Sequence, residues 1–441
     1  MTRTIRWKAL LAARSPREVS ASMSWLFRHR VREFLRTSFW FEPVAAVFLG
    51  ALATHVISLF EDQATWRWRD YSPEGARSIL GVLAGATLTY LGFSISSLLL
   101  VAQIASAQLT PRIIPFALGW RFVRASVCLF VFTFVVVSGA IGRIGDRVHQ
   151  FQVFFAVALF LVSTMVFLWF AYRLAMGMRP VSVLRDVADR AETVIREMYA
   201  EPFDPATPEF AGPAAPAEGE GVVLRHMGKA GVIQAFGARD LALAAEQAGG
   251  RLEVVPMVGD FVSPGDPLFR FHGGGTPPTA EDLETMVSIG IGRTLAQDPR
   301  FALRILADIG CRALSAAVND PTTAVHALDQ IQRLLRWLGE RRLDAGRVLD
   351  REGGIRLSYR TPPWEALVAL GLSEIRAYGA ASLQVTRRLH ALLHYLMENL
   401  PPARGPALRR QLELVHASAL RAFPVEADLH SAETDDRQGL G

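Results

Sequence analysis

Long apolar stretches separated by short charged segments fill the first 176 residues, and the longest of them is 79–109. Its thirty-one residues carry no charged side chain, which is typical of a helix that crosses a membrane. At about 1.5 Å per residue this helix reaches roughly 45 Å, more than the ~30 Å hydrocarbon layer. The stretches 40–60, 123–141 and 151–176 are also long enough to cross. The pattern therefore predicts four membrane-spanning helices.

The 79–109 helix carries a stripe of small and polar residues at helical spacing. Its members are Gly85, Thr89, Gly92, Ser96, Gln103 and Ser106. Helix packing is one explanation, because small residues let neighbouring backbones approach closely. A water-filled path is the other, because polar groups inside a membrane tend to face a cavity or a bundle interior. These six residues are therefore the candidates for lining a pore.

The periodicity changes after the fourth span. An amphipathic helix is predicted at 180–199, followed by a proline-rich linker. Short strands are predicted at 222–224, 231–233, 251–255 and 267–271, with a helix at 238–248. The phrase GDFVSPGDPL at 259–268 resembles the turns of barrel-sandwich folds, so a small β-barrel-like module is expected. Further helices are predicted at 282–295, 300–316, 321–338, 363–378, 382–400 and 407–422.

These elements predict a membrane protein with a four-helix α transmembrane region followed by a cytosolic α+β region, which combines the β-barrel-like module with a helical bundle. The expected order is a basic segment with an interfacial helix (1–38), the transmembrane domain (39–176), a stalk helix and linker (177–221), the β module (222–272), a helical domain (279–424) and a disordered tail (425–441).

Charge separates the two halves of the chain. The first 176 residues carry a net charge of +10 and the remainder −5. The basic half predicts anionic lipid headgroups of the bilayer as partners rather than nucleic acid. Basic residues precede the first span and occupy the segment between the second and the third. Because positively charged loops stay on the cytoplasmic side, this distribution predicts that both termini lie on the cytoplasmic side of a bacterial inner membrane.

Several groups of polar side chains could form a binding site, although a structural role also explains each group. Asn319, Asp320 and Thr322 combine an amide, a carboxylate and a hydroxyl, but Asp320 before a proline is also a good helix N-cap. Arg293 and Asp298 are expected to form an ion pair or to line a pocket.

The helix at 382–400 presents His390, His394 and Glu398 at intervals of four residues, a spacing that suits a metal or a solvated helix face. The solvated face is the favoured interpretation. No catalytic residue, metal or cofactor is predicted, and Cys128 and Cys311 are expected to be packing residues.

The chain resembles a family of predicted bacterial membrane proteins, domain-of-unknown-function family 2254. The matching phrases are SFWF (38–41), QIASAQLTPR (103–112), GDFV (259–262), RT (293–294) with QD (297–298), and ALS (313–315) through NDPTTA (319–324). The resemblance implies N-terminal spans and a soluble C-terminal half, but it implies no particular activity.

Two functions from different classes fit these observations. The first is a homo-oligomeric channel for ions or small solutes, in which copies of the 79–109 helix surround a path and the cytosolic region forms a vestibule or gate. The second is a membrane-anchored sensor or scaffold without transport activity. An enzyme is disfavoured because the sequence offers no convincing set of nucleophile or metal ligands.

Overall fold

The computed structural model describes residues 41–63, 71–113, 121–145, 148–177, 179–207, 209, 221–343 and 346–437. The chain divides into two compact units, an N-terminal unit within 32–183 and a C-terminal unit that begins at Leu184. The interfacial helix predicted within 1–38 lies outside the described residues. Each unit is described separately below.

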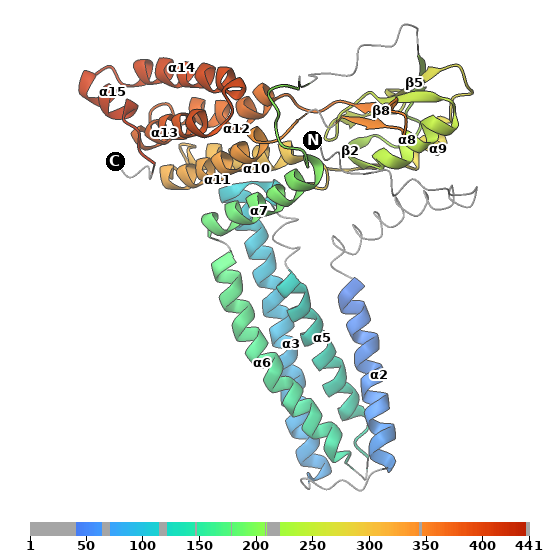
Figure 1. The fold of residues 1–441 in the computed structure, drawn as a ribbon. Coiled ribbons are helices and arrows are strands. Elements are labelled where there is room, and N and C mark those ends of the chain that lie inside the picture. Colours follow the sequence, from blue (N-terminus) through green and yellow to red (C-terminus); the bar gives the residue numbers. More distant parts are fainter. Residues whose placement is uncertain are drawn as a thin grey trace. The chain divides into compact units, whose positions relative to one another are not determined.

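The N-terminal unit consists of four long helices that lie side by side (Figure 1). They are α2 (Phe41–Gln63), α3 (Pro73–Ile104), α5 (Arg121–Gly142) and α6 (Gln150–Gly177). Among the described residues, these four helices are long and apolar enough to cross a membrane. The predicted spans therefore match observed helices. Helix α3 begins six residues earlier than predicted because Ser72 caps it, accepting a hydrogen bond from the backbone N–H of Gly75.

Helix α5 contacts each of the other three helices and forms the centre of the bundle. Close contact with α2 depends on Gly139, where an added Cβ would lie 2.7 Å from the Thr54 side chain. The hydroxyls of Thr133 on α5 and Ser163 on α6 are 2.7 Å apart in the buried interior. Small residues and paired hydroxyls are the usual means by which helices associate in lipid.

The C-terminal unit contains helices and two sheets. Its helices are α7 (Pro180–Met198), α8 (Ala238–Gln247), α9 (Ala280–Glu284), α10 (Pro299–Ala313), α11 (Pro321–Gly339), α12 (Trp364–Tyr378), α13 (Leu383–Asn399), α14 (Gly405–Ala422) and α15 (Glu426–Glu433). Its strands are β1 (Val222–Arg225), β2 (Gly231–Phe236), β3 (Gly250–Val254), β4 (Phe261–Val262), β5 (Pro267–Gly273), β6 (Val287–Gly290), β7 (Arg347–Leu349) and β8 (Ile355–Tyr359).

The predicted β-barrel-like module is wrong, because the strands form two open sheets. One sheet has the order β1-β5-β3-β8-β7, and the other has the order β4-β2-β6. Strand β3 pairs in parallel with β8, which enters the sheet only after α10 and α11. The strands of the 222–272 segment are thus divided between two sheets. Two of them pair with strands from later in the chain, β3 with β8 and β2 with β6.

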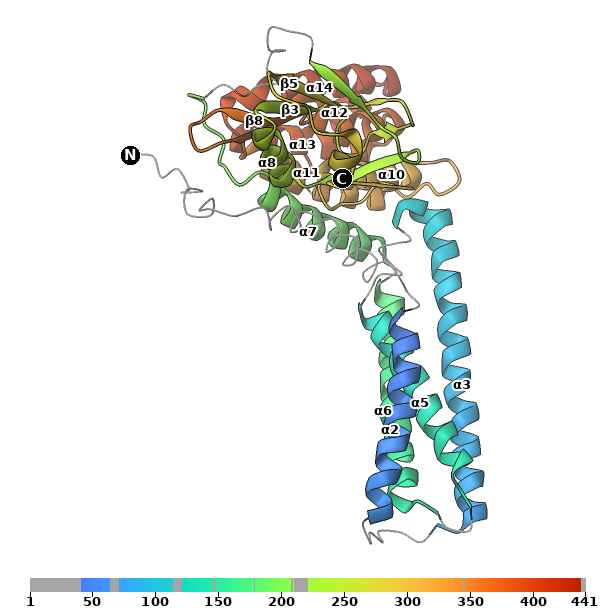
Figure 2. The same ribbon diagram turned by 90° about the vertical axis from the view of Figure 1, so that its right-hand side faces the viewer.

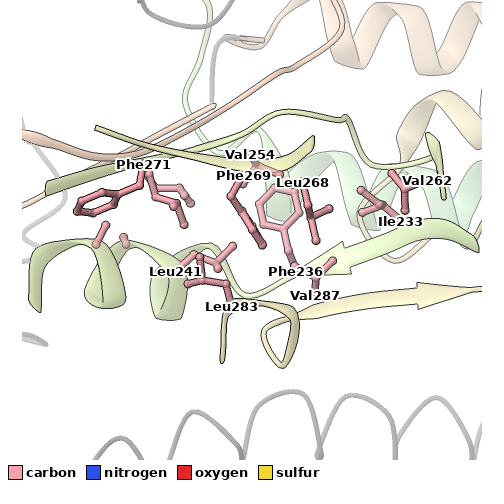
Figure 3. Packing of buried hydrophobic residues seen from close by; sticks show 14 residues of the cluster. Ile233, Phe236, Leu241, Val254, Val262, Leu268, Phe269, Phe271, Leu283 and Val287 are labelled. Carbon is pink, nitrogen blue, oxygen red and sulfur yellow. The ribbon is translucent and has the colours of Figure 1, made fainter. Parts of the chain in front are cut away.

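An apolar core lies between the sheets and helix α8. It includes Phe236, Leu241, Phe269 and Phe271, each at most 3% exposed. Figure 3 shows Leu241 of α8 pointing toward the strand that carries Phe269 and Phe271. Burial of such side chains stabilises the fold by about 1.5–3 kcal/mol each.

Two local predictions are corrected by the structure. The helix expected at 282–295 is instead the short α9 followed by β6, because Val287 and Ile289 pair with Phe236 and Ile233 of β2. The disordered tail expected at 425–441 contains α15, on which Ala432 is fully buried. Pairing and packing partners far away in the sequence decide both segments. The other helices predicted between 300 and 422 correspond to α10–α14 within two or three residues.

Candidate functional site

The predicted stripe on α3 faces away from the bundle to which α3 belongs. Gly85, Thr89, Gly92, Ser96 and Gln103 are exposed, and Ser106 is half-buried. The opposite side of the helix is the packed one, with Ala76, Leu80, Thr87, Ser94, Leu98 and Val101 buried. Figure 2 shows α3 along one side of the four-helix bundle. The stripe therefore lines no path inside a single copy of the chain.

The exposed face of α3 combines the stripe with large apolar side chains on its flanks, including Val82, Leu88 and Leu99. An added Cβ at Gly85 or Gly92 would meet nothing within 4 Å. The Thr89 hydroxyl donates to its own helix at the Gly85 carbonyl, 2.9 Å away. Neither the Ser96 hydroxyl nor the Gln103 amide has a side-chain hydrogen bond to any residue that the structure describes. A polar group inside a membrane is costly when it has no hydrogen-bond partner. Water or another chain would have to hydrogen-bond these two groups.

Helix α3 ends in an irregular turn. A five-residue π-helix, Ala105–Leu109, follows it and includes Ser106, and a 3-10 turn at Pro111–Ile113 comes next. Short π-helical segments occur frequently at functional sites, where they change the direction of side chains. Ser106 lies within this π-helical segment and is half-buried, unlike the other residues of the stripe.

The structure brings together residues from two phrases that lie about 35 positions apart. The Arg293 Nε–H donates to the Gly259 carbonyl at 2.9 Å. Gly259 has a φ of +93°, and an added Cβ there would lie 2.6 Å from Oδ2 of Asp298. Asp298 is only 3% exposed, and its Oδ1 caps α10 by accepting from the backbone N–H of Phe301. Arg293 and Asp298 thus form one polar cluster with Gly259.

Asp298 is the buried carboxylate of this cluster. Its Oδ2 is buried and has no hydrogen-bond partner among the described residues. Burial raises the pKa of Asp298 above its ordinary value, although the positive charges of Arg293 and Arg300 oppose the shift. The folded protein therefore holds a proton on this group more tightly than the unfolded chain does.

We expect Asp298→Asn to change the pH dependence of stability. The contribution of a carboxyl with a raised pKa is present below its unfolded pKa, near 4, and is lost as pH rises through its folded pKa. The asparagine keeps a cap for α10 and does not titrate. Wild type should therefore lose stability relative to the variant as pH increases, as measured by denaturant unfolding at pH 5 and pH 8. A constant difference between the two proteins would contradict the raised pKa.

The Asn319–Asp320–Thr322 motif forms the start of α11. The Asp320 carboxylate accepts from the backbone N–H of Thr323 at 3.0 Å and also from its hydroxyl. Asn319 has a φ of +48°, a left-handed conformation that asparagine tolerates better than most residues. The side chains of Asn319 and Thr322 are exposed. These contacts favour the structural interpretation of the motif.

The two histidines of α13 group with Asp435 rather than with Glu398. His390 and His394 lie close to Asp435, which follows α15, and these three residues form a group able to hold a metal ion. Glu398 is not part of this group. The carboxylate that completes the group comes from the segment predicted to be a disordered tail, so the spacing on one helix could not reveal it.

Two side chains of the C-terminal unit that carry nucleophilic atoms, Cys311 and Ser315, are poorly suited to covalent chemistry. Burial raises the pKa of the Cys311 thiol to about 12, which disfavours the reactive thiolate. The Ser315 hydroxyl donates to the Arg312 carbonyl at 2.7 Å, which is a local turn contact.

Sequence reasoning missed a buried ion pair in the C-terminal unit. Arg404 is 4% exposed and makes two hydrogen bonds to the Glu209 carboxylate, at 2.6 and 2.7 Å. It also donates to the carbonyls of Gly339 and Arg341. The partners are separated by 195 positions, and Glu209 lies in a proline-rich segment, so neither residue gave a local signal.

Four apolar helices and an α+β region with polar clusters define a multi-span membrane protein with a large second unit. The chain belongs to the family of predicted membrane proteins DUF2254, whose model matches residues 36–395. It is 28% identical over 421 residues to the uncharacterised proteins Rv1290c of Mycobacterium tuberculosis and Mb1321c of Mycobacterium bovis. Each alignment covers 91% of this chain and 80% of the relative. No solved structure matches the chain.

Proposed function

We propose that copies of this chain assemble in the membrane around α3, and that the stripe lines a path for ions or small solutes between them. The observation that supports this proposal is the exposure of the stripe directly opposite the packed face of α3. The same polar residues would be expected to point inward if one bundle were the complete unit.

Lipid is a poor neighbour for the polar groups of the stripe, although it suits the apolar side chains on either side of them. The unpaired Gln103 amide and Ser96 hydroxyl would lose their hydrogen bonds to water without gaining others. The open positions at Gly85 and Gly92 allow a second backbone to approach closely. A symmetric ring of α3 helices places both kinds of residue against protein or water.

The proposal includes an orientation in the membrane. Nine of the Lys and Arg residues precede α2, and three more, Arg112, Arg121 and Arg124, lie from the turn after α3 to the first turns of α5. Under the positive-inside rule, both termini and the C-terminal unit face the cytoplasm of a bacterial inner membrane. The basic residues then contact anionic headgroups, and the C-terminal unit forms the vestibule or gate.

The test combines a mass measurement with a flux measurement. Wild type, Ser96→Leu, Gln103→Leu and the control Ile95→Leu are reconstituted in nanodiscs for mass determination and in liposomes for ion flux. Ile95 is exposed on α3 beside the stripe, so leucine there changes neither polarity nor size appreciably. We expect an oligomer with flux for wild type and the control, and at least a tenfold lower flux for the two stripe variants.

Either of two results would contradict this function. A strictly monomeric wild-type protein excludes a path between copies. An oligomer whose flux is absent, or unchanged by both stripe substitutions, excludes α3 as the lining. The spans would then serve as an anchor for the C-terminal unit, which is the sensor or scaffold alternative.

A further inference from the structure

Helix α15 packs on α13 and α14 within the C-terminal unit (Figure 1). A cluster of histidine and carboxylate side chains lies on α13 and just after α15. His390 and His394 stand one turn apart on α13, with ring centroids separated by 6.1 Å. The two carboxylate oxygens of Asp435 are 2.8 and 3.0 Å from Nδ1 of His394. One potential ligand atom from each of the three residues lies within 4.8 Å of the other two.

His390 is the member of this cluster that packing alone does not explain. Its side chain is 5% exposed, and its Nε2 is buried without a hydrogen-bond partner among the described residues. Leaving a polar atom buried and unpaired costs about 1–3 kcal/mol. Burial together with the nearby His394 lowers the pKa of His390 from its ordinary value. The neutral form is the one that binds metal ions.

The distances are close to those of a zinc site. Nitrogen and oxygen ligands lie about 2 Å from zinc in a tetrahedral arrangement, which separates ligand atoms by about 3.3 Å. The three potential ligand atoms, all within 4.8 Å of one another, would have to close to that separation around an ion. The side chains of His394 and Asp435 are 40% and 46% exposed, so the site is open to solvent. His390 supplies the fixed, buried ligand.

We propose that His390, His394 and Asp435 bind a divalent transition-metal ion of the zinc class, which fastens α15 to α13. Two imidazoles and one carboxylate are a ligand set that such ions accept, with water in the fourth position. Neighbouring contacts also hold α15 against α13 and α14. Arg387 donates to the Ser431 carbonyl at 2.6 Å, and His416 of α14 pairs with Glu433.

Zinc binding by the full-length protein tests this site. The protein is purified through an affinity tag without histidine, stripped with a chelator and titrated with Zn²⁺ in nanodiscs. The test variants are His394→Ala and the isosteric Asp435→Asn. The controls are Glu398→Gln, one turn further along α13, and His326→Ala, which removes a half-exposed histidine that pairs with Asp329 on α11.

We expect wild type and both controls to bind one Zn²⁺ per chain and to gain thermal stability with the metal. The two test variants should bind at least tenfold more weakly and lose that gain. Wild type without stoichiometric zinc binding would overturn the proposal. So would Asp435→Asn and His394→Ala variants that bind as wild type does, or controls that lose binding equally. None of these outcomes depends on the proposed channel.

Discussion

Arg404→Ala should lower the free energy of unfolding by about 3–5 kcal/mol, because it leaves Glu209 without the cation that neutralises it. The Arg404 side chain is 5% exposed and that of Glu209 is 20% exposed, so water replaces the lost partner only in part. The guanidinium also lies 4.3 Å from the centre of the Phe203 ring. Removing it deletes a stacking contact as well as the ion pair.

The measurement is denaturant unfolding of the full-length protein, followed by tryptophan fluorescence. Trp364 is a local reporter, because its indole N–H donates to the backbone carbonyl of Arg404, which alanine retains. Arg409→Ala is the matched control, since Arg409 is exposed on the following helix. Arg404→Lys keeps the charge but loses the bidentate hydrogen bonds. Its free energy of unfolding should therefore lie between those of Arg404→Ala and Arg409→Ala. Equal midpoints for Arg404→Ala and Arg409→Ala would refute the structural role of the pair.

Gly259→Ala should destabilise the C-terminal unit by about 3 kcal/mol, for two reasons that add. The φ of +93° strains any residue with a Cβ, at a cost of about 1–3 kcal/mol. The new methyl group would also lie 2.6 Å from Asp298 Oδ2 and 3.1 Å from Arg293 Nε. Asp298 is buried at the start of α10, so it has little room to move away.

Gly265→Ala separates the two contributions. Gly265 has a φ of +92°, almost the same as that of Gly259, but an added Cβ there meets nothing within 4 Å. We expect the Gly265 variant to lose only the backbone contribution, about 1–2 kcal/mol. Thermal unfolding of both variants measures the difference. Losses of equal size would mean that the contact with Asp298 contributes nothing.

Most helices of this protein were predictable because their sequence signals are local, whereas α9 and α15 were not. The four spans are marked by long apolar runs with few charged residues, and they match α2, α3, α5 and α6. In the C-terminal unit, Asp298 and Asp320 each precede a proline and cap the helices α10 and α11. Caps and helical periodicity depend on residues within a few positions of each other, so a sequence is sufficient to recognise them.

The sheets and the polar clusters required partners that are distant in the chain. Strand β3 pairs with β8 about a hundred residues later, which no local pattern indicates. The carboxylate of Asp435 joins two histidines some forty positions earlier on α13. The predicted module at 222–272 looked self-contained because the turns in it are local, whereas sheet closure depends on which strands become neighbours.

The sequence by itself predicted four membrane-spanning helices, most helices of the C-terminal unit to within a few residues, and the polar stripe on α3. Those properties follow from hydrophobicity and spacing along one helix. Only the tertiary structure decided that the stripe faces outward, because the direction of a helix face depends on which side the neighbours α5 and α6 cover. The clusters at Gly259, Arg404 and His390 were decided in the same way, by packing that brings together residues the chain keeps apart.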